Sequence, residues 1–78
     1  MIDADKVKEF ASNLLPIDVI AILLDVDEYL LSEAISDKKS CVSKAYRLGQ
    51  ALTISEIRKQ EVELAKAGSP LAVQNISN

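Results

Sequence analysis

The apolar residues between Ile17 and Ile35 have the spacing of two short amphipathic helices joined by a tight turn. The first helix is expected over about residues 17–24. The second is expected to start after Asp27, a residue type that commonly caps helices, and to end near Ser36. Two helices that cross over so short a connection make a helix-turn-helix unit. This feature predicts an all-α fold built around that unit.

The inner faces of the two helices carry the residue types that such a unit needs. Ala21 is small enough for the helices to approach closely, and Val26 can close the inside of the turn. Asp25 stands where glycine is usual, and aspartate adopts a left-handed conformation more readily than most residues. The apolar pattern resembles that of phage-repressor helix-turn-helix units. The second helix is expected to bury four apolar side chains: Leu30, Leu31, Ala34 and Ile35.

Helices are expected on both sides of this unit. Two glycines and two prolines among 78 residues are few for the many tight turns of a sandwich or barrel. An N-terminal helix capped by Asp3 or Asp5 should end before Pro16. Its apolar face would comprise Val7, Phe10, Ala11 and Leu14.

A long helix should follow, from a cap at Ser40 to Ala67, with Gly68 after its end. About 28 residues of helix extend about 40 Å, more than the rest of so small a chain can cover. Its distal half therefore needs a partner. Ser69-Pro70 begins a fifth helix that has no stop signal before Asn78, so we expect either a longer protein or a frayed terminus. The expected regions are a helix-turn-helix-like three-helix unit at 1–37 and an assembly region at 38–78.

The residues for common enzyme chemistry are scarce. The chain has no histidine and one cysteine, Cys41, so the usual nucleophilic, acid–base and transition-metal sites are missing. We expect no catalytic residue, metal or cofactor, and interpret the acids around Asp25 as helix caps and surface charge. The longest apolar run, Val19 to Leu24, is too short to span a bilayer, and no signal-peptide pattern is visible. A cytoplasmic location without membrane association is therefore expected.

Charge is divided unevenly along the chain. Residues 1–37 carry nine acids and two lysines, a net charge of −7, whereas residues 38–78 carry seven bases and three acids, a net charge of +4. Such asymmetry is typical of a nucleic-acid face or of a self-complementary assembly surface. Both alternatives stay open at the level of sequence.

In the first alternative the chain binds double-stranded DNA. Basic residues after the second helix of the unit would contact phosphates: Lys38, Lys39, Lys44 and Arg47. Residues of that helix would approach base edges: Tyr29, Ser32 and Ser36. The outer face of the helix carries acids and no lysine or arginine, which opposes direct DNA contact, and a merely solvated basic face is the plain alternative.

In the second alternative the chain is an oligomerisation or adaptor module without direct DNA contact. The long helix and the segment after it would pair with other copies, and the helix-turn-helix would serve as scaffold. The expected contact residues are Gly49, Leu52, Ile57, Leu64 and Leu71.

From Pro16 onward the order of elements resembles the N-terminal region of phage terminase small subunits. The likeness rests on the helix-turn-helix, on "DKKSCVSKAYRLGQA" at 37–51, on the polar helix "SEIRKQEVELAKAG" at 55–68 and on the hinge "AKAGSP" before "LAVQNIS". It covers about three-quarters of the chain. The resemblance implies a non-catalytic DNA-recognition subunit that forms a ring and presents viral DNA to a large motor subunit, in a bacterial host cell or encoded by a prophage.

Overall fold

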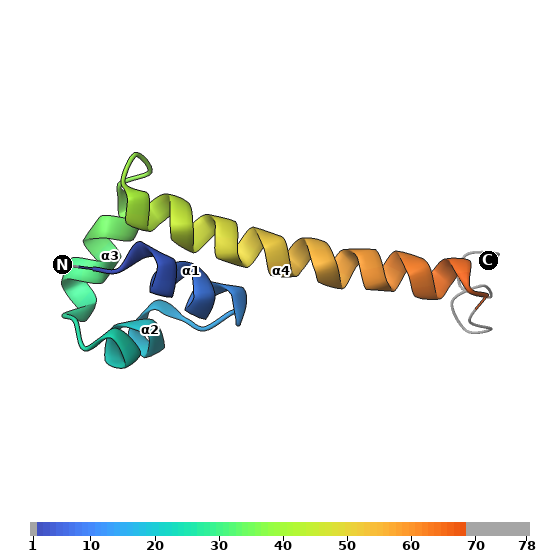
Figure 1. The fold of residues 1–78 in the computed structure, drawn as a ribbon, viewed down its shortest axis with the longest axis horizontal. Coiled ribbons are helices and arrows are strands. Elements are labelled where there is room, and N and C mark those ends of the chain that lie inside the picture. The colour runs from blue at the N-terminus through green and yellow to red at the C-terminus, as the bar shows by residue number, and fades with distance from the viewer. Residues whose placement is uncertain (1, 69–78) are drawn as a thin grey trace.

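The structure, a computed structural model, describes residues 2–68. This part of the chain contains four helices and no strand: α1 (Ala4–Ser12), α2 (Ile17–Leu24), α3 (Glu28–Ser36) and α4 (Cys41–Lys66). Helices α1 and α3 pack against the first half of α4, α2 packs against α1 and α3, and the second half of α4 projects away from them (Figure 1). The predicted all-α class is confirmed for these residues. The expected fifth helix and Leu71 lie outside the described residues.

Three helices start at caps made by their own side chains. The Asp27 carboxylate accepts hydrogen bonds from two amides in the first turn of α3, at 2.8 and 3.1 Å. The Ser40 hydroxyl accepts one from the first turn of α4 at 3.0 Å, and Asp3, not Asp5, caps α1. Since each cap depends only on residues two or three positions away, the sequence was enough to predict Asp27 and Ser40.

Helices α1 and α2 end in the same way, each followed by a residue in the left-handed conformation. Asp25 after α2 has φ 55°, as expected at the glycine position of the turn, and the Val26 amide then donates back to the Ala21 carbonyl at 3.0 Å. Leu14 after α1 has φ 58° and the same type of bond follows it. These are the bonds of a Schellman motif, which usually has glycine at this position. The prediction that Leu14 lies on the buried face of α1 was wrong, because the helix ends before Leu14 and the turn exposes it.

The core lies where α1, α2, α3 and the start of α4 meet. Its buried apolar residues are Val7, Ala11, Ile20, Ala21 and Leu31. Leu31 is central on the inner face of α3, and successive helical residues are separated by about 100° around the axis. The prediction that Leu30 is buried was therefore wrong: its side chain falls outside the covered arc and is 61% exposed.

Helix α1 crosses α4 at a very short distance, and Gly49 permits this. A Cβ atom at Gly49 would collide with the backbone carbonyl oxygen of Lys8 and would lie 3.0 Å from the Cβ of Ala11. The Thr53 hydroxyl, one turn further on, donates to the Ser12 carbonyl. Within residues 2–68, no helix covers α4 beyond Thr53 (Figure 1).

The uncovered part of α4, residues 54–66, is called the free half. All its side chains except that of Ala65 are exposed. Four of them are large and apolar: Ile54, Ile57, Val62 and Leu64. The expectation that the distal half of this helix extends past the rest of the fold is confirmed for residues 2–68. None of the helices within residues 2–68 combines the length and the apolar character needed to cross a membrane.

Candidate interaction surfaces

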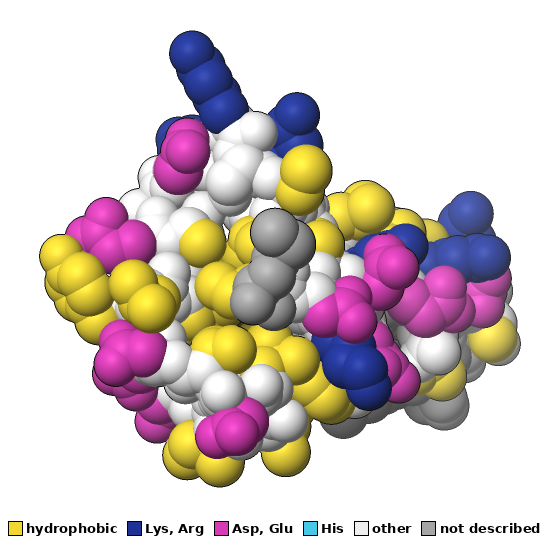
Figure 2. Space-filling model, turned by 60° about the vertical axis from the view of Figure 1, so that its left-hand side comes forward, with side chains coloured by type: hydrophobic (Ala, Val, Ile, Leu, Met, Phe, Trp, Pro, Cys, Tyr) yellow, Lys and Arg dark blue, Asp and Glu magenta, His cyan; other side chains and the backbone are white. Residues whose placement is uncertain are grey.

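Four cations predicted to contact DNA lie around the turn between α3 and α4, and we call them the basic corner: Lys38, Lys39, Lys44 and Arg47. The turn is held by Asp37, whose carboxylate accepts from the Lys39 amide at 3.1 Å, and by the Ser40 hydroxyl, which donates to the Ala34 carbonyl at 2.6 Å. The Arg47 guanidinium donates to the Lys38 carbonyl at 3.3 Å. All four side chains are exposed, and Figure 2 shows Lys and Arg side chains over the top of this end of the molecule.

The residues predicted to approach base edges are less favourably arranged. Tyr29 is exposed but lies at the start of α3, a helix about 13 Å long, whereas the basic corner follows its end. Ser36 donates its hydroxyl to the Ser32 carbonyl at 2.9 Å, and Ser32 is partly buried. Glu33 lies exposed between them. The structure therefore brings the cations together but does not bring Tyr29 to them.

The outside of α2 and α3 carries exposed apolar side chains among acids, and we call this surface the acidic face. Its apolar members are Ile22, Leu23, Tyr29 and Leu30, of which Ile22 is 77% exposed. Its acids are Asp18, Asp25, Asp27, Glu28 and Glu33. No lysine or arginine occurs between Lys8 and Lys38. Figure 2 shows hydrophobic and acidic side chains interspersed over the left-hand and lower parts of this end. The sequence analysis identified the acids on the outside of α3 but missed the apolar part of this surface, because it assigned Leu30 to the core.

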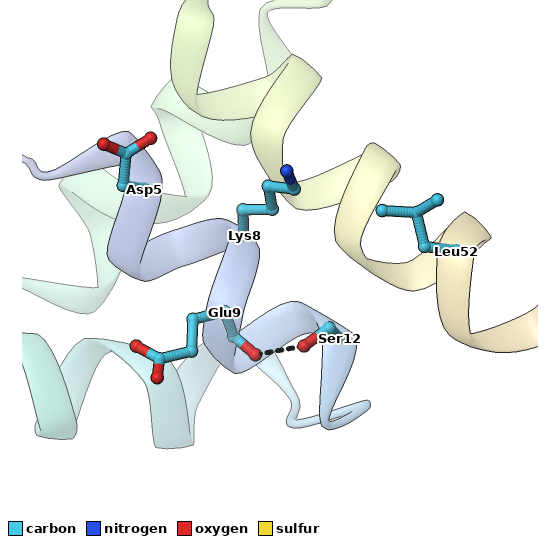
Figure 3. A pocket seen from close by; sticks show the side chains of 5 residues that line it. All are labelled: Asp5, Lys8, Glu9, Ser12 and Leu52. Carbon is cyan, nitrogen blue, oxygen red and sulfur yellow. Dashed lines mark hydrogen bonds between the residues drawn. The ribbon is translucent and has the colours of Figure 1, made fainter.

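The residues predicted for oligomerisation fall into two groups. Gly49 is buried against α1 of its own chain and is not available to another copy. Leu52 is half exposed at the edge of the α1–α4 contact, beside a shallow hollow that Lys8 and Ser12 also line (Figure 3). Ile57 and Leu64 lie in the free half, where Leu64 is 64% exposed.

One polar atom in the core has no partner. Ser43 is fully buried near the start of α4, and its hydroxyl makes no hydrogen bond within the described part of the chain. An open hollow elsewhere, between α2, α3 and Tyr46, is lined by the carboxylates of Asp18 and Glu28. No three metal-ligating side chains gather anywhere in residues 2–68.

Comparisons with protein-family models, with curated proteins and with solved structures gave no match to this chain.

Proposed function

We propose that this chain is a non-catalytic helical assembly module, in which the free half of α4 packs against a second copy. The observation that carries the proposal is the presence of four large, exposed apolar side chains on the half of α4 that nothing else in residues 2–68 covers. Fully burying one such side chain contributes about 1.5–3 kcal/mol, and three of them, Ile54, Ile57 and Leu64, lie on one side of the helix, so they supply a substantial driving force for association. The α2–α3 hairpin, interpreted as a helix-turn-helix unit, then serves as the scaffold that holds α4.

A partner would also stabilise the helical structure of the free half. Thirteen residues of helix without tertiary contacts are only marginally stable in water. Packing against another chain would supply the contacts that the rest of the described chain does not provide. Self-association would therefore both bury apolar surface and order this part of α4.

Sedimentation equilibrium tests the proposal with a matched pair of variants. Replacing Ile54, Ile57, Val62 and Leu64 together by glutamine removes the exposed apolar side chains of the free half while keeping good helix formers. We expect the wild-type chain to associate and this variant to be monomeric, with amide hydrogen exchange in α1 to α3 unchanged. The control, Glu56→Gln/Glu63→Gln, alters exposed polar residues of the same segment and should associate like the wild type. A wild-type chain that stays monomeric would overturn the proposal.

A second candidate function is DNA binding of the terminase small-subunit kind, with a large motor subunit as further partner. The observation in its favour is the basic corner, which gathers four exposed cations at one end of the molecule. Phosphate contacts made by lysine and arginine give an affinity that falls steeply with salt. The acidic face beside α3 would be repelled by DNA, so we rank this function below assembly.

Fluorescence anisotropy with a labelled duplex at low salt tests this second function. We expect binding that is lost when all four residues of the basic corner are changed to alanine. The control is Arg58→Ala/Lys59→Ala, which removes two cations from the free half. Binding that survives in the first variant, or that is equally reduced in the control, would count against the basic corner as a DNA site.

A further inference from the structure

One side of the free half has the residue spacing of a coiled coil. Its members follow each other at intervals of three and four residues, so they lie along one side of the helix. We call this row the seam: Ile54, Ile57, Glu61 and Leu64. All four side chains are exposed, and three of them are large and apolar. These intervals are those of the two contact positions in a coiled-coil heptad, so the seam fits a second helix.

The side of the free half opposite the seam carries acids and bases in alternation. Its charged residues follow each other at intervals of three, four and three: Glu56, Lys59, Glu63 and Lys66. Opposite charges at these intervals attract each other within one helix. This side therefore needs no partner to balance its charge, and the charges on and beside the seam decide what the seam can bind.

The seam and its two edges contain one acid and one base. Glu61 lies within the seam, and Arg58 lies at its edge, one turn earlier. The other edge positions, among them Gln60 and Ala65, are uncharged. A surface with one acid and one base near its middle is complementary to a copy of itself that runs in the opposite direction. This complementarity favours a second copy of the chain as the partner.

An antiparallel pair of free halves brings the residues of the seam into register. When Ile54 is level with Leu64 of the second copy, Ile57 is level with Glu61 of the second copy. Arg58 then lies on the same side of the pair as Glu61 of the second copy, and only about 1.5 Å from its level along the axis. The two-fold symmetry repeats each of these contacts. Apolar side chains therefore meet at both ends of the contact, and two ion pairs form near its middle.

A parallel pair has two disadvantages. It places the two Glu61 carboxylates at the same level, where like charges oppose each other. It also brings together the two heads, the parts formed by α1 to α3. The head covers the seam side of the first half of α4, where Gln50 and Ser43 lie seven and fourteen residues before Ile57; Gln50 is partly buried and Ser43 fully buried. An antiparallel pair places the heads at opposite ends, since the free half projects away from the head (Figure 1).

We propose that the free halves of two copies pair through the seam as an antiparallel coiled coil, with Glu61 of each copy bound to Arg58 of the other. The contact is isologous, because the same surface of both copies takes part. This inference rests on the proposed self-association, and it names the side of α4, the direction of the partner and the residues that determine the register. A single polar residue at a contact position typically determines the register of a coiled coil at some cost in stability, and Glu61 has that place here.

The direction of the pair can be measured through Cys41. It is the only cysteine of the chain and is exposed at the start of α4, so a nitroxide label can be attached without any substitution. In the antiparallel pair the two Cys41 positions lie about 54 Å apart along the axis, and in a parallel pair they are level. Pulsed electron paramagnetic resonance should therefore give a distance between labels of more than about 50 Å, whereas a parallel pair would give less than about 35 Å. Sedimentation equilibrium of the labelled chain checks that the label leaves association unchanged.

Charge reversal tests the contact between Glu61 and Arg58. Arg58→Glu and Glu61→Arg each set like charges opposite each other twice in the pair, and we expect each to raise the dissociation constant at least about tenfold. The double variant Arg58→Glu/Glu61→Arg exchanges the two charges and should return the dissociation constant to within about threefold of the wild-type value.

The matched controls are Lys59→Glu and Glu63→Arg. They change the net charge by the same amounts as the single reversals, but on the side opposite the seam. Each should therefore leave the dissociation constant within about threefold of the wild-type value. Sedimentation equilibrium measures all these variants.

The outcomes separate the two proposals. A wild-type chain that associates with a short distance between the labels on Cys41 would overturn the antiparallel coiled coil and leave self-association standing. The same holds if the single reversals associate like the wild type, if the double variant does not recover, or if the controls weaken association as much as the reversals do. A monomeric wild-type chain would overturn both proposals.

Discussion

At the scale of single residues, the backbone conformation of Asp25 after α2 can be tested by substitution. Asp25 has a left-handed conformation that costs L-residues about 1–2 kcal/mol and glycine almost nothing. We expect Asp25→Gly to raise the free energy of unfolding by about 0.5–1 kcal/mol, measured by urea denaturation, because part of this gain is lost to the greater entropy of the unfolded chain.

Asp25→Ala is the control, since it removes the same charge without glycine's freedom. It should lower the free energy of unfolding by up to about 1 kcal/mol. Equal effects of the two substitutions would show that charge, and not backbone conformation, decides stability at this position.

Gly49 marks the closest approach of α1 to α4. Gly49→Ala places a methyl group against the Lys8 carbonyl, so the helices must separate. We expect a loss of about 1–3 kcal/mol in urea denaturation, the usual range for overpacking, although alanine is the better helix former. Gln60→Ala, an exposed substitution in the same helix, should change stability by only a few tenths of a kcal/mol. A stabilised Gly49→Ala protein would contradict the observed packing.

A substitution at Ser43 is expected to stabilise the protein, in contrast to Gly49→Ala. Its buried hydroxyl has no hydrogen-bond partner within the described residues, and an unsatisfied buried polar group costs about 1–3 kcal/mol. Ser43→Ala removes that group and fits the same space, so we expect the free energy of unfolding to rise by about 1 kcal/mol in urea denaturation. A clear loss of stability would show that the hydroxyl is hydrogen-bonded in solution.

At the scale of elements, features that depend on neighbouring residues were predictable from the sequence. Features that depend on contacts between distant helices were not. The cap residues Asp27 and Ser40 act on amides of the next turn, so the starts of α3 and α4 followed from the sequence. Leu30 was placed in the core because the spacing allowed it. Its exposure depends on which side of α3 the rest of the fold occupies, and a periodic pattern does not determine that.

The candidate sites show the same difference between features set by neighbouring residues and features set by contacts between helices. The clustering of the basic corner followed from neighbouring sequence positions, whereas the burial of Gly49 depends on contact with α1, a helix distant in sequence. The acids on the outside of α3 followed from the sequence, whereas the apolar part of the acidic face depends on the exposure of Leu30 and could not be found before the helices were placed.

The two halves of α4 should differ in dynamics. The first half is covered by α1 and α3, and the free half has no tertiary contact within residues 2–68 that would protect its amides. In hydrogen exchange at low protein concentration, we expect strong protection near Gly49 and weak protection from about Ile57 onward. Raising the concentration should increase protection in the free half only. Strong protection there at the lowest concentration would mean that the free half is ordered without a second copy.

At the scale of the whole molecule, the separation of charge predicts how association responds to salt. Added salt shortens the screening length from about 10 Å at 0.1 M to about 3 Å at 1 M. Because residues 1–37 carry a net charge of −7 and residues 38–78 one of +4, copies of the chain attract each other, and we expect the dissociation constant to rise several-fold over this range. An association that strengthens with sodium chloride would indicate a contact that is apolar alone.

Self-association through α4 is the central claim, and the molar mass of the chain in solution tests it most directly. Sedimentation equilibrium of the 78-residue chain over a wide range of concentration should give a weight-average mass that rises well above the 8.5 kDa monomer. A mass that stays at 8.5 kDa at every concentration would contradict the account.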